Sequence, residues 1–235
     1  MRACLVGMLL VVALAAAGCG GGGSSTSASD NGEASKSAHQ VLTDSLKAAE
    51  AASSFRMSGL INASGQSIGV DLTIAKGKGA QGSITLKGHK VELVVVDGYA
   101  YMKADGNFWK QFAGPAGTAI AALLKDNWLK FPTDNPQFGA IAAIADAKAL
   151  FDEIGSKSGT PTNNGATLYK GEKVVAIAGG QSKGTFYVAS TGTPYPVALV
   201  RTGASSGAVV FTNWGEPVTI EAPANSIDIS KLAGG

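Results

Sequence analysis

Two long stretches of the chain, residues 55–112 and residues 166–221, alternate apolar with polar or small side chains at a period of two. This period places successive side chains on opposite faces of a β-sheet. Each stretch therefore predicts a meander of strands with one buried and one solvated face. Because the buried faces need a covering layer, the chain is restricted to a few layered folds.

The first stretch shows the clearest alternation. Its apolar positions, which we expect on the inner face of a sheet, are Ile68, Val70, Leu72, Ile74, Ile84, Leu86, Val91, Leu93 and Val95, and Glu92 is expected outside. Asp97-Gly98 predicts a hairpin turn, since glycine tolerates the positive φ of such turns, and Asp105-Gly106 repeats the signal one strand later. We expect five or six strands between Phe55 and Phe112.

Helical patterns lie on either side of this meander. Ser37 and Gln40 form a capping-box pattern, which predicts that a helix starts there, and the apolar residues that follow at helical spacing end near Ser53. The middle of the chain, residues 114–155, is helical in spacing and unusually apolar; helices are expected after Gly114-Pro115 and after Asn135-Pro136, with a short strand at 128–131 between them. These helices are apolar nearly all round, so either a protein core or another apolar substance must cover them.

The second stretch predicts six further strands. They are residues 166–170, 174–178, 184–189, 195–201, 207–212 and 217–221, separated by glycine turns. The order is therefore helix, meander, helical insertion and second meander, which is an α+β arrangement. The two antiparallel halves could be continuous as one large curved sheet.

The N-terminus carries a targeting pattern. Residues 3–17 are almost unbroken apolar residues behind Arg2, too short to span a bilayer and typical of a secretory signal. Ala16-Ala17-Gly18-Cys19 resembles a bacterial lipobox, in which the signal is cut before a diacylglyceryl cysteine, although Ala16 stands where leucine is usual. The sequence predicts lipidation at Cys19; the alternative is an ordinary secreted protein with a chance cysteine.

Three segments are expected: a lipoprotein signal peptide (1–18), a lipidated cysteine with a flexible Gly/Ser-rich tether (19–36) and one folded domain (37–235). Removal of the signal would leave 217 residues, 18 basic and 17 acidic side chains, and Cys19 as the only cysteine. A net charge near zero argues against nucleic acid as a partner. A domain that starts near Ser37 should fold alone.

Motifs that would carry chemistry lack their structural context. Residues 77–82 fit G-x-G-x-x-G, but a strand follows where the fingerprint needs a helix. Ser67 and Ser182 sit in G-x-S-x-G patterns; Ser182 has no later histidine, and Ser67 enters a strand rather than a helix. The two histidines, His39 and His89, have no metal-ligand spacing to a partner. We expect no enzyme activity, no metal and no cofactor.

Several strings occur in a telling order: Asp97-Gly98-Tyr99-Ala100-Tyr101 before Trp109, residues 169–175, Tyr195-Pro196-Val197, residues 210–223 and Ile227-Asp228-Ile229. With the lipobox, they resemble the mycobacterial LppX/LprA/LprF/LprG lipoprotein family over most of residues 37–232. Members of that family resemble LolA/LolB carriers. The resemblance implies a large curved antiparallel sheet, a half-barrel, that wraps helices on its concave side around an apolar cavity for acyl chains.

The resemblance thus implies a lipoprotein that binds acyl chains of a lipid or glycolipid for transport or presentation in the cell envelope. The expected lining residues are Ile68, Val70, Leu72, Ile84, Leu86, Leu93 and Val95 from the sheet and Ile120, Leu124, Ile141 and Ile144 from the helices. We expect an exported monomer that is anchored through acylated Cys19 to the outer face of the cell membrane, with an envelope transporter as a further partner.

Two other interpretations stay open. The same apolar pattern would also form a solid core, and the protein would then be a non-catalytic module that binds another envelope protein through its sheet surface. A serine hydrolase built on Ser67, with Asp71 and His89 downstream, ranks third.

Overall fold

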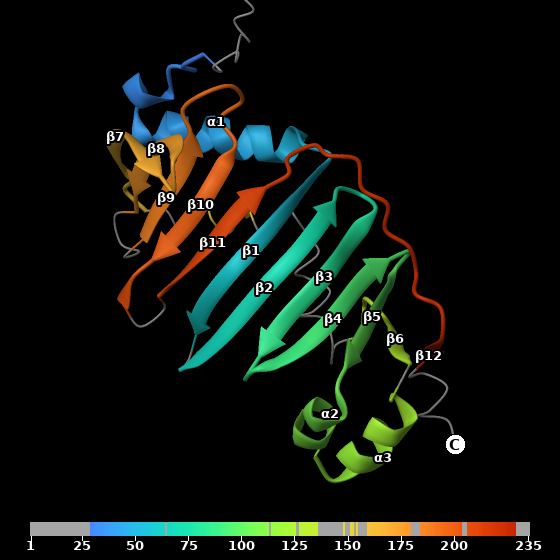
Figure 1. Cartoon of the computed structure of the whole chain (residues 1–235). Coiled ribbons are helices and arrows are strands. Elements are labelled where there is room, and N and C mark those ends of the chain that lie inside the picture. Colours follow the sequence, from blue (N-terminus) through green and yellow to red (C-terminus); the bar gives the residue numbers. More distant parts are fainter. Residues whose placement is uncertain are drawn as a thin grey trace, which may run out of the picture.

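One large sheet dominates the computed structural model, which describes residues 29–63, 65–112, 114–125, 127–135, 148, 151–152, 154, 159–179, 184–203 and 206–228. Within these residues, twelve strands follow the order β12-β6-β5-β4-β3-β2-β1-β11-β10-β9-β8-β7 (Figure 1). The expected curved sheet with helices on its concave side is confirmed. The described residues contain no helix with the length and hydropathy needed to cross a membrane.

Each predicted meander is present. The first comprises β1 (Ser54–Ala63), β2 (Gln66–Ala75), β3 (Gly79–Leu86), β4 (His89–Val96) and β5 (Tyr99–Ala104), and the second comprises β7 (Thr162–Tyr169), β8 (Glu172–Ala178), β9 (Gly184–Ala189), β10 (Pro196–Arg201) and β11 (Gly207–Thr212). The short strand expected in the middle is β6 (Trp128–Pro132), and β12 (Ser226–Asp228) lies beside it.

The two meanders are continuous because β1 pairs with β2 on one side and with β11 on the other. Arg56 lies opposite Thr212, and Ile61 lies opposite Gly207. Among the described strands, all pairs are antiparallel except β6 with β12, which are parallel. The predicted antiparallel sheet is therefore present, and its pairing becomes parallel at this edge.

Helix α1 (Ala38–Ala51) begins at the predicted capping box. The Ser37 hydroxyl accepts from the Gln40 amide, and the Gln40 side chain accepts from the Ser37 amide. Val41 and Leu42 of α1 are buried and pack against an apolar patch on β8 and β9 that consists of Val175, Ile177, Phe186 and Val188. The helix thus covers the inner face of the second meander (Figure 1).

The first meander ends earlier than expected, because Asp105-Gly106 starts a helix instead of a hairpin. The Asp105 carboxylate accepts a 2.7 Å hydrogen bond from the Phe108 amide and so caps α2 (Gly106–Phe112). This bond, with a smaller contribution from His89, lowers the pKa of Asp105. A lowered carboxyl pKa adds stability above the unfolded-state value, and that stability is lost as pH falls through the folded-state pKa. Beyond α2 lie η2 (Gly114–Ala116) and α3 (Gly117–Leu123), near the predicted position.

Residues 217–221 were expected to form a strand, and this expectation is wrong. They belong to an extended connection, residues 213–225, that leaves β11 and reaches β12 at the far edge of the sheet (Figure 1). Val218 and Ile220 are half-buried there, whereas Pro217, Thr219 and Glu221 are exposed. The alternation in the sequence therefore arises because one side of this segment is covered by the domain, although the segment does not pair as a strand. We call residues 213–225 the connecting strap.

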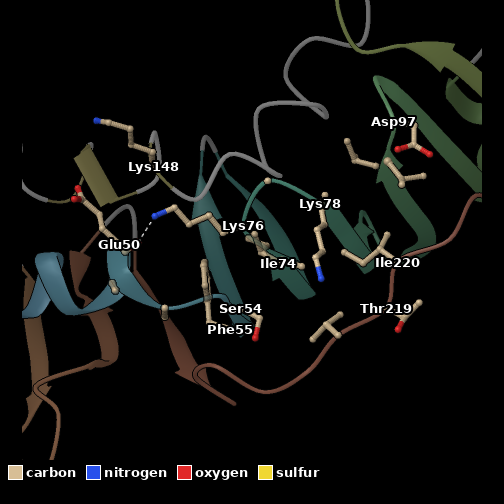
Figure 2. Close-up of a pocket in the computed structure, with 18 of the residues that line it drawn as sticks. Glu50, Ser54, Phe55, Ile74, Lys76, Lys78, Asp97, Lys148, Thr219 and Ile220 are labelled. Carbon is tan, nitrogen blue, oxygen red and sulfur yellow. Dashed lines mark hydrogen bonds between the residues drawn. The ribbon is translucent and has the colours of Figure 1, made fainter.

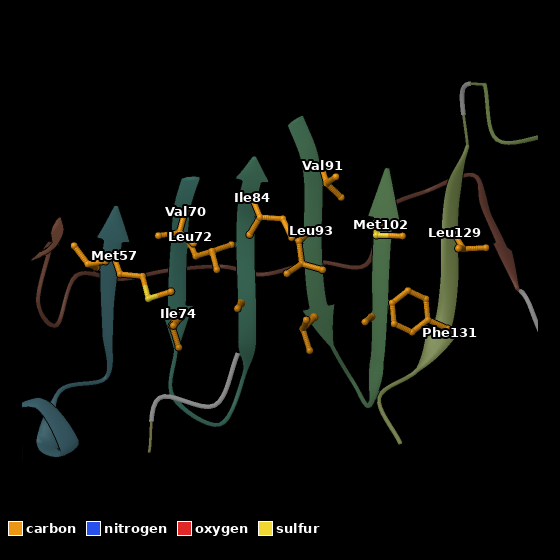
Figure 3. Close-up of a cluster of buried hydrophobic side chains, with 14 of the residues drawn as sticks. Met57, Val70, Leu72, Ile74, Ile84, Val91, Leu93, Met102, Leu129 and Phe131 are labelled. Carbon is orange, nitrogen blue, oxygen red and sulfur yellow. The ribbon is translucent and has the colours of Figure 1, made fainter. Parts of the chain in front are cut away.

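The inner face of the first meander carries the apolar side chains that the alternation predicts. Val70 lies opposite Ile84 and Ile84 lies opposite Val91, so these side chains stand side by side on one face. Figure 3 shows them with Leu72 and Leu93 in one cluster. On the other face, Arg56 binds Asp71 through two hydrogen bonds of 2.7 and 2.8 Å, in keeping with a solvated outer surface.

Gly82, in the middle of β3, lets neighbouring strands approach closely. Its φ is +147°, and a Cβ at this position would lie 2.1 Å from the Asp71 carbonyl oxygen. Gly82→Ala should therefore destabilise the domain by about 1–3 kcal/mol, the usual range for forcing a side chain into such a backbone. Chemical denaturation would measure this. Gly69→Ala on β2 is the control, because Gly69 has no positive φ and a Cβ there would lie no closer than 3.1 Å to its nearest contact, the Thr85 Cβ; equal losses would contradict the explanation.

Residues 29–36, expected in the tether, contact the folded domain. Asp30 forms a bridge with Thr191, the Asn31 amide donates to the Ser190 carbonyl at 3.0 Å, and the Asn31 side chain donates to the Ala189 carbonyl at 2.9 Å. Further along, Glu33 in η1 (Glu33–Ser35) is buried and binds Lys36 at 2.7 Å. We call residues 29–36 the docked segment.

Removing the docked segment should weaken the domain without unfolding it. A fragment of residues 37–235 should fold, with mixed sheet and helix in circular dichroism, but should melt below a fragment of residues 29–235. Each hydrogen bond lost contributes about 0.5–1.5 kcal/mol. Thermal unfolding of the two fragments measures the difference. Identical melting curves would show that the docked segment adds no stability.

Candidate functional site

A cavity of about 980 Å³ opens at one end of the sheet. That end is formed by the turns 76–78 and 97–98 and by the start of β1, and the C-terminal end of α1 and the connecting strap complete the wall. We call it the pocket rim. The volume lies near the upper end of the range for small-molecule sites, about 300–1,000 Å³.

Apolar side chains form the inner part of this cavity. They come from the sheet, from the described part of residues 148–154 and from the strap, and include Phe55, Ile74, Val95, Phe151, Val218 and Ile220. Phe55, Ile74, Val95 and Phe151 also belong to the large core cluster. The cavity is thus a continuation of the core toward solvent, and an apolar chain that entered it would contact core side chains directly.

Charged side chains surround the mouth. Figure 2 shows Lys76, Lys78 and Lys148 with Glu50 and Asp97 around the cavity. Lys76 donates a hydrogen bond to the backbone carbonyl of Glu50, which ties the turn between β2 and β3 to the end of α1. The site therefore combines an apolar interior with a mixed charged rim. That combination suits a molecule with an apolar part and a polar end.

An aromatic cluster holds the cavity wall where the two meanders meet. The Trp214 ring of the strap stacks on Phe55 with centroids 5.0 Å apart and on Tyr195 at 4.7 Å. Its indole nitrogen donates to the Pro196 carbonyl at 3.1 Å. Phe151 packs 5.3 Å from Phe55. The first residues of the strap are therefore fixed to both meanders.

The sequence-predicted lining residues fall into three groups. Of those in the described part of the chain, only Val95 lines the cavity. The core cluster takes in Val70, Leu72, Ile84, Leu93 and Leu124 as buried residues and Ile68, Leu86 and Ile120 as half-buried neighbours. Ile141 and Ile144 lie outside the described residues, as does Cys19. Protein atoms cover the side chains of Leu72 and Leu93 completely, with 0% exposure.

Several cavity residues were not anticipated. Lys76 and Lys78 lie in a glycine turn, and such turns are normally read as plain solvent loops. Val218 and Ile220 carry an alternating pattern that was assigned to a strand. The one available signal was the alternation of lysine and glycine at residues 76–79 between two apolar strands, and it carries little information in a glycine-rich chain.

The residues of the hydrolase interpretation do not come together. Ser67 is exposed on β2 and donates to the Asn62 side chain. Arg56 holds the Asp71 carboxylate and lowers the pKa of Asp71, whereas His89 lies 3.6 Å from Asp105. Ser182 lies outside the described residues. Within the described part of the chain, no three His, Cys, Asp or Glu residues are grouped as metal ligands.

Solved structures with this fold include two from mycobacteria. LprF from Mycobacterium bovis aligns with a TM-score of 0.55 and 18% identity over 80% of this chain and 97% of its own. The Mycobacterium tuberculosis lipoprotein LppX aligns with a TM-score of 0.52 and 15% identity over 78% of this chain and 98% of its own. No model of a known protein family and no curated protein matches the sequence. The expected likeness to LppX and LprF is confirmed at the level of the fold.

Proposed function

We propose that this protein is a membrane-anchored lipoprotein that binds acyl chains of a lipid or glycolipid in the cavity at the pocket rim. It would carry or present that lipid in the cell envelope, as a monomer and without catalysis. The observation that carries the proposal is the cavity itself, whose apolar interior continues into the core and whose mouth is charged. Transfer of an acyl chain from water into an apolar cavity is favourable by about 0.8 kcal/mol for each methylene buried.

The lipobox supports the anchor and the fold supports the carrier role. Cys19 follows the small residues of a signal-like segment, and two or three acyl chains on one cysteine would hold the domain stably on a bilayer. The LppX structure, which shares the fold, is that of a lipoprotein. The cavity needs no reactive group to bind a lipid, since partition of the acyl chains supplies the affinity.

Native mass spectrometry tests the binding step. Residues 29–235, purified without detergent and incubated with vesicles of phosphatidylcholine and phosphatidylinositol, should appear with an added mass equal to one lipid. Partition holds the lipid in the apolar site while the vesicles are removed in water, and van der Waals contacts with the cavity wall retain it during the measurement.

The competing interpretation gives a different result in the same experiment. If the core is filled and the protein is an interaction module, only the mass of the bare polypeptide should appear at every lipid concentration. That outcome, combined with specific capture of an envelope protein on the sheet surface, would replace the lipid-carrier proposal.

A further inference from the structure

The docked segment leaves the domain at the same end of the sheet as the cavity. Ser54 lies opposite Ala75 and Arg56 lies opposite Thr212, so β1 begins and β11 ends at the pocket rim. Arg201 of β10 pairs with Gly207 of β11 at the opposite rim, so β10 begins at the pocket rim. The turn 190–195, which precedes β10 and binds the docked segment, therefore also lies at the pocket rim (Figure 1).

Backbone and side-chain contacts fix this exit point. Ser29 accepts from the Gly192 amide at 3.2 Å, and the Asn31 side chain donates to the Gly192 carbonyl at 3.1 Å in addition to its Ala189 bond. Downstream, the Asn163 side chain donates to the Lys36 carbonyl at 2.7 Å. Lys36 also binds the Asp44 carboxylate of α1 at 2.7 Å, and hydrogen bonds to Asp44 and Glu33 raise the pKa of Lys36.

The chain between Cys19 and Ser29 is short compared with the height of the sheet. Ten residue steps cover at most about 35 Å when fully extended. One ten-residue strand such as β2 spans about 30 Å from the pocket rim to the opposite rim. With the opposite rim on the membrane, the chain from Ser29 would have to run the whole height of the domain, at almost full extension. With the pocket rim on the membrane, it keeps its conformational freedom.

We propose that the docked segment orients the domain so that the pocket rim faces the lipid bilayer that holds Cys19. This inference rests on the proposed acylation of Cys19, and it adds to the proposed function that the cavity exchanges its lipid directly with the anchoring membrane. The bilayer is the partner of the rim because the chain that leaves the rim is anchored in it.

Energy transfer to the membrane tests the orientation. The acylated full chain is reconstituted in phosphatidylcholine vesicles that contain a small fraction of acceptor-labelled lipid headgroups. A donor dye is attached at Asp134→Cys or at Gln66→Cys, both exposed; the acylated Cys19 sulfur is a thioether and does not react. Asp134 follows Thr133, whose amide binds the Gly98 carbonyl at the pocket rim, and Gln66 begins β2 at the opposite rim.

Transfer from position 134 should be severalfold greater than transfer from position 66. Insertion of a long Gly/Ser stretch between Ala28 and Ser29 should remove the difference, and Asn31→Ala should reduce it, because it loosens the exit point. Equal transfer from both positions with the natural tether, or greater transfer from position 66, would overturn the orientation.

The same preparation separates failure of the orientation from failure of the proposed function. Partition of the chain into the aqueous phase of a Triton X-114 extraction would show that the anchor itself is absent, and the inference would fall with it. If the chain is anchored but positions 134 and 66 show no difference in energy transfer, the orientation is overturned and the proposed function is not affected. Lipid in the cavity is read independently by native mass spectrometry and does not affect the transfer signal.

Discussion

Val95→Trp should abolish lipid binding and leave the melting temperature of the lipid-free domain nearly unchanged. Val95 is buried on β4 but lines the cavity, so the larger indole can extend into space that an acyl chain would occupy. Binding of a fluorescent fatty acid measures the first effect and thermal unfolding of delipidated protein measures the second.

Leu93→Trp is the matched control, two residues earlier on the same strand and on the same face. Leu93 has 0% exposure and does not line the cavity, so the indole must displace packed neighbours. Overpacking of this kind costs about 1–3 kcal/mol and lowers the melting temperature. The cavity is not an acyl-chain site if Val95→Trp destabilises the protein as much as Leu93→Trp and the wild-type protein binds no lipid. That result would favour the interaction-module interpretation.

Cys19→Ser should move the whole protein from the detergent phase to the aqueous phase of a Triton X-114 extraction. The serine hydroxyl cannot accept the diacylglyceryl group, so the protein carries no acyl anchor. It therefore loses the membrane affinity that the anchor supplies, about 0.8 kcal/mol per buried methylene. Phase partition after expression in a bacterial host with intact lipoprotein processing is the measurement.

Cys4→Ser provides the control, because Cys4 lies in the segment that processing would remove. It should leave the protein in the detergent phase. A wild-type protein that stays in the aqueous phase in such a host would show that Ala16-Ala17-Gly18-Cys19 is not a working lipobox.

Sequence patterns predicted the strands and the first helix well, because local physics decides them. The alternation from Ile68 to Ile74 fixes which face of β2 is buried, and Ser37 and Gln40 define the start of α1. The pairing of neighbouring strands was equally predictable wherever a short glycine turn joins them. These features depend on residues only a few positions apart.

Predictions that depended on distant partners were less successful. The Asp105 carboxylate can accept a backbone hydrogen bond either in a hairpin turn or at the start of a helix. Phe108 and Trp109 are buried in the core, and this packing favours the helix. The strap alternates like a strand because Val218 and Ile220 face the cavity, which no local pattern can reveal. For the same reason the predicted lining included the packed Leu72 and Leu93 and omitted Lys76 and Lys78.

The pairing of β1 with β11 has a consequence for the order of folding. Arg56 and Thr212 are 156 residues apart, whereas β1 meets β2 through a short hairpin. Loop-closure entropy grows only slowly with length, so the distant pairing adds little to the equilibrium cost, but contacts between remote residues slow folding. The first meander can form while the edge of β1 still awaits β11. During that interval β1 is an unpaired edge strand, and other unfolded chains can bind it and aggregate.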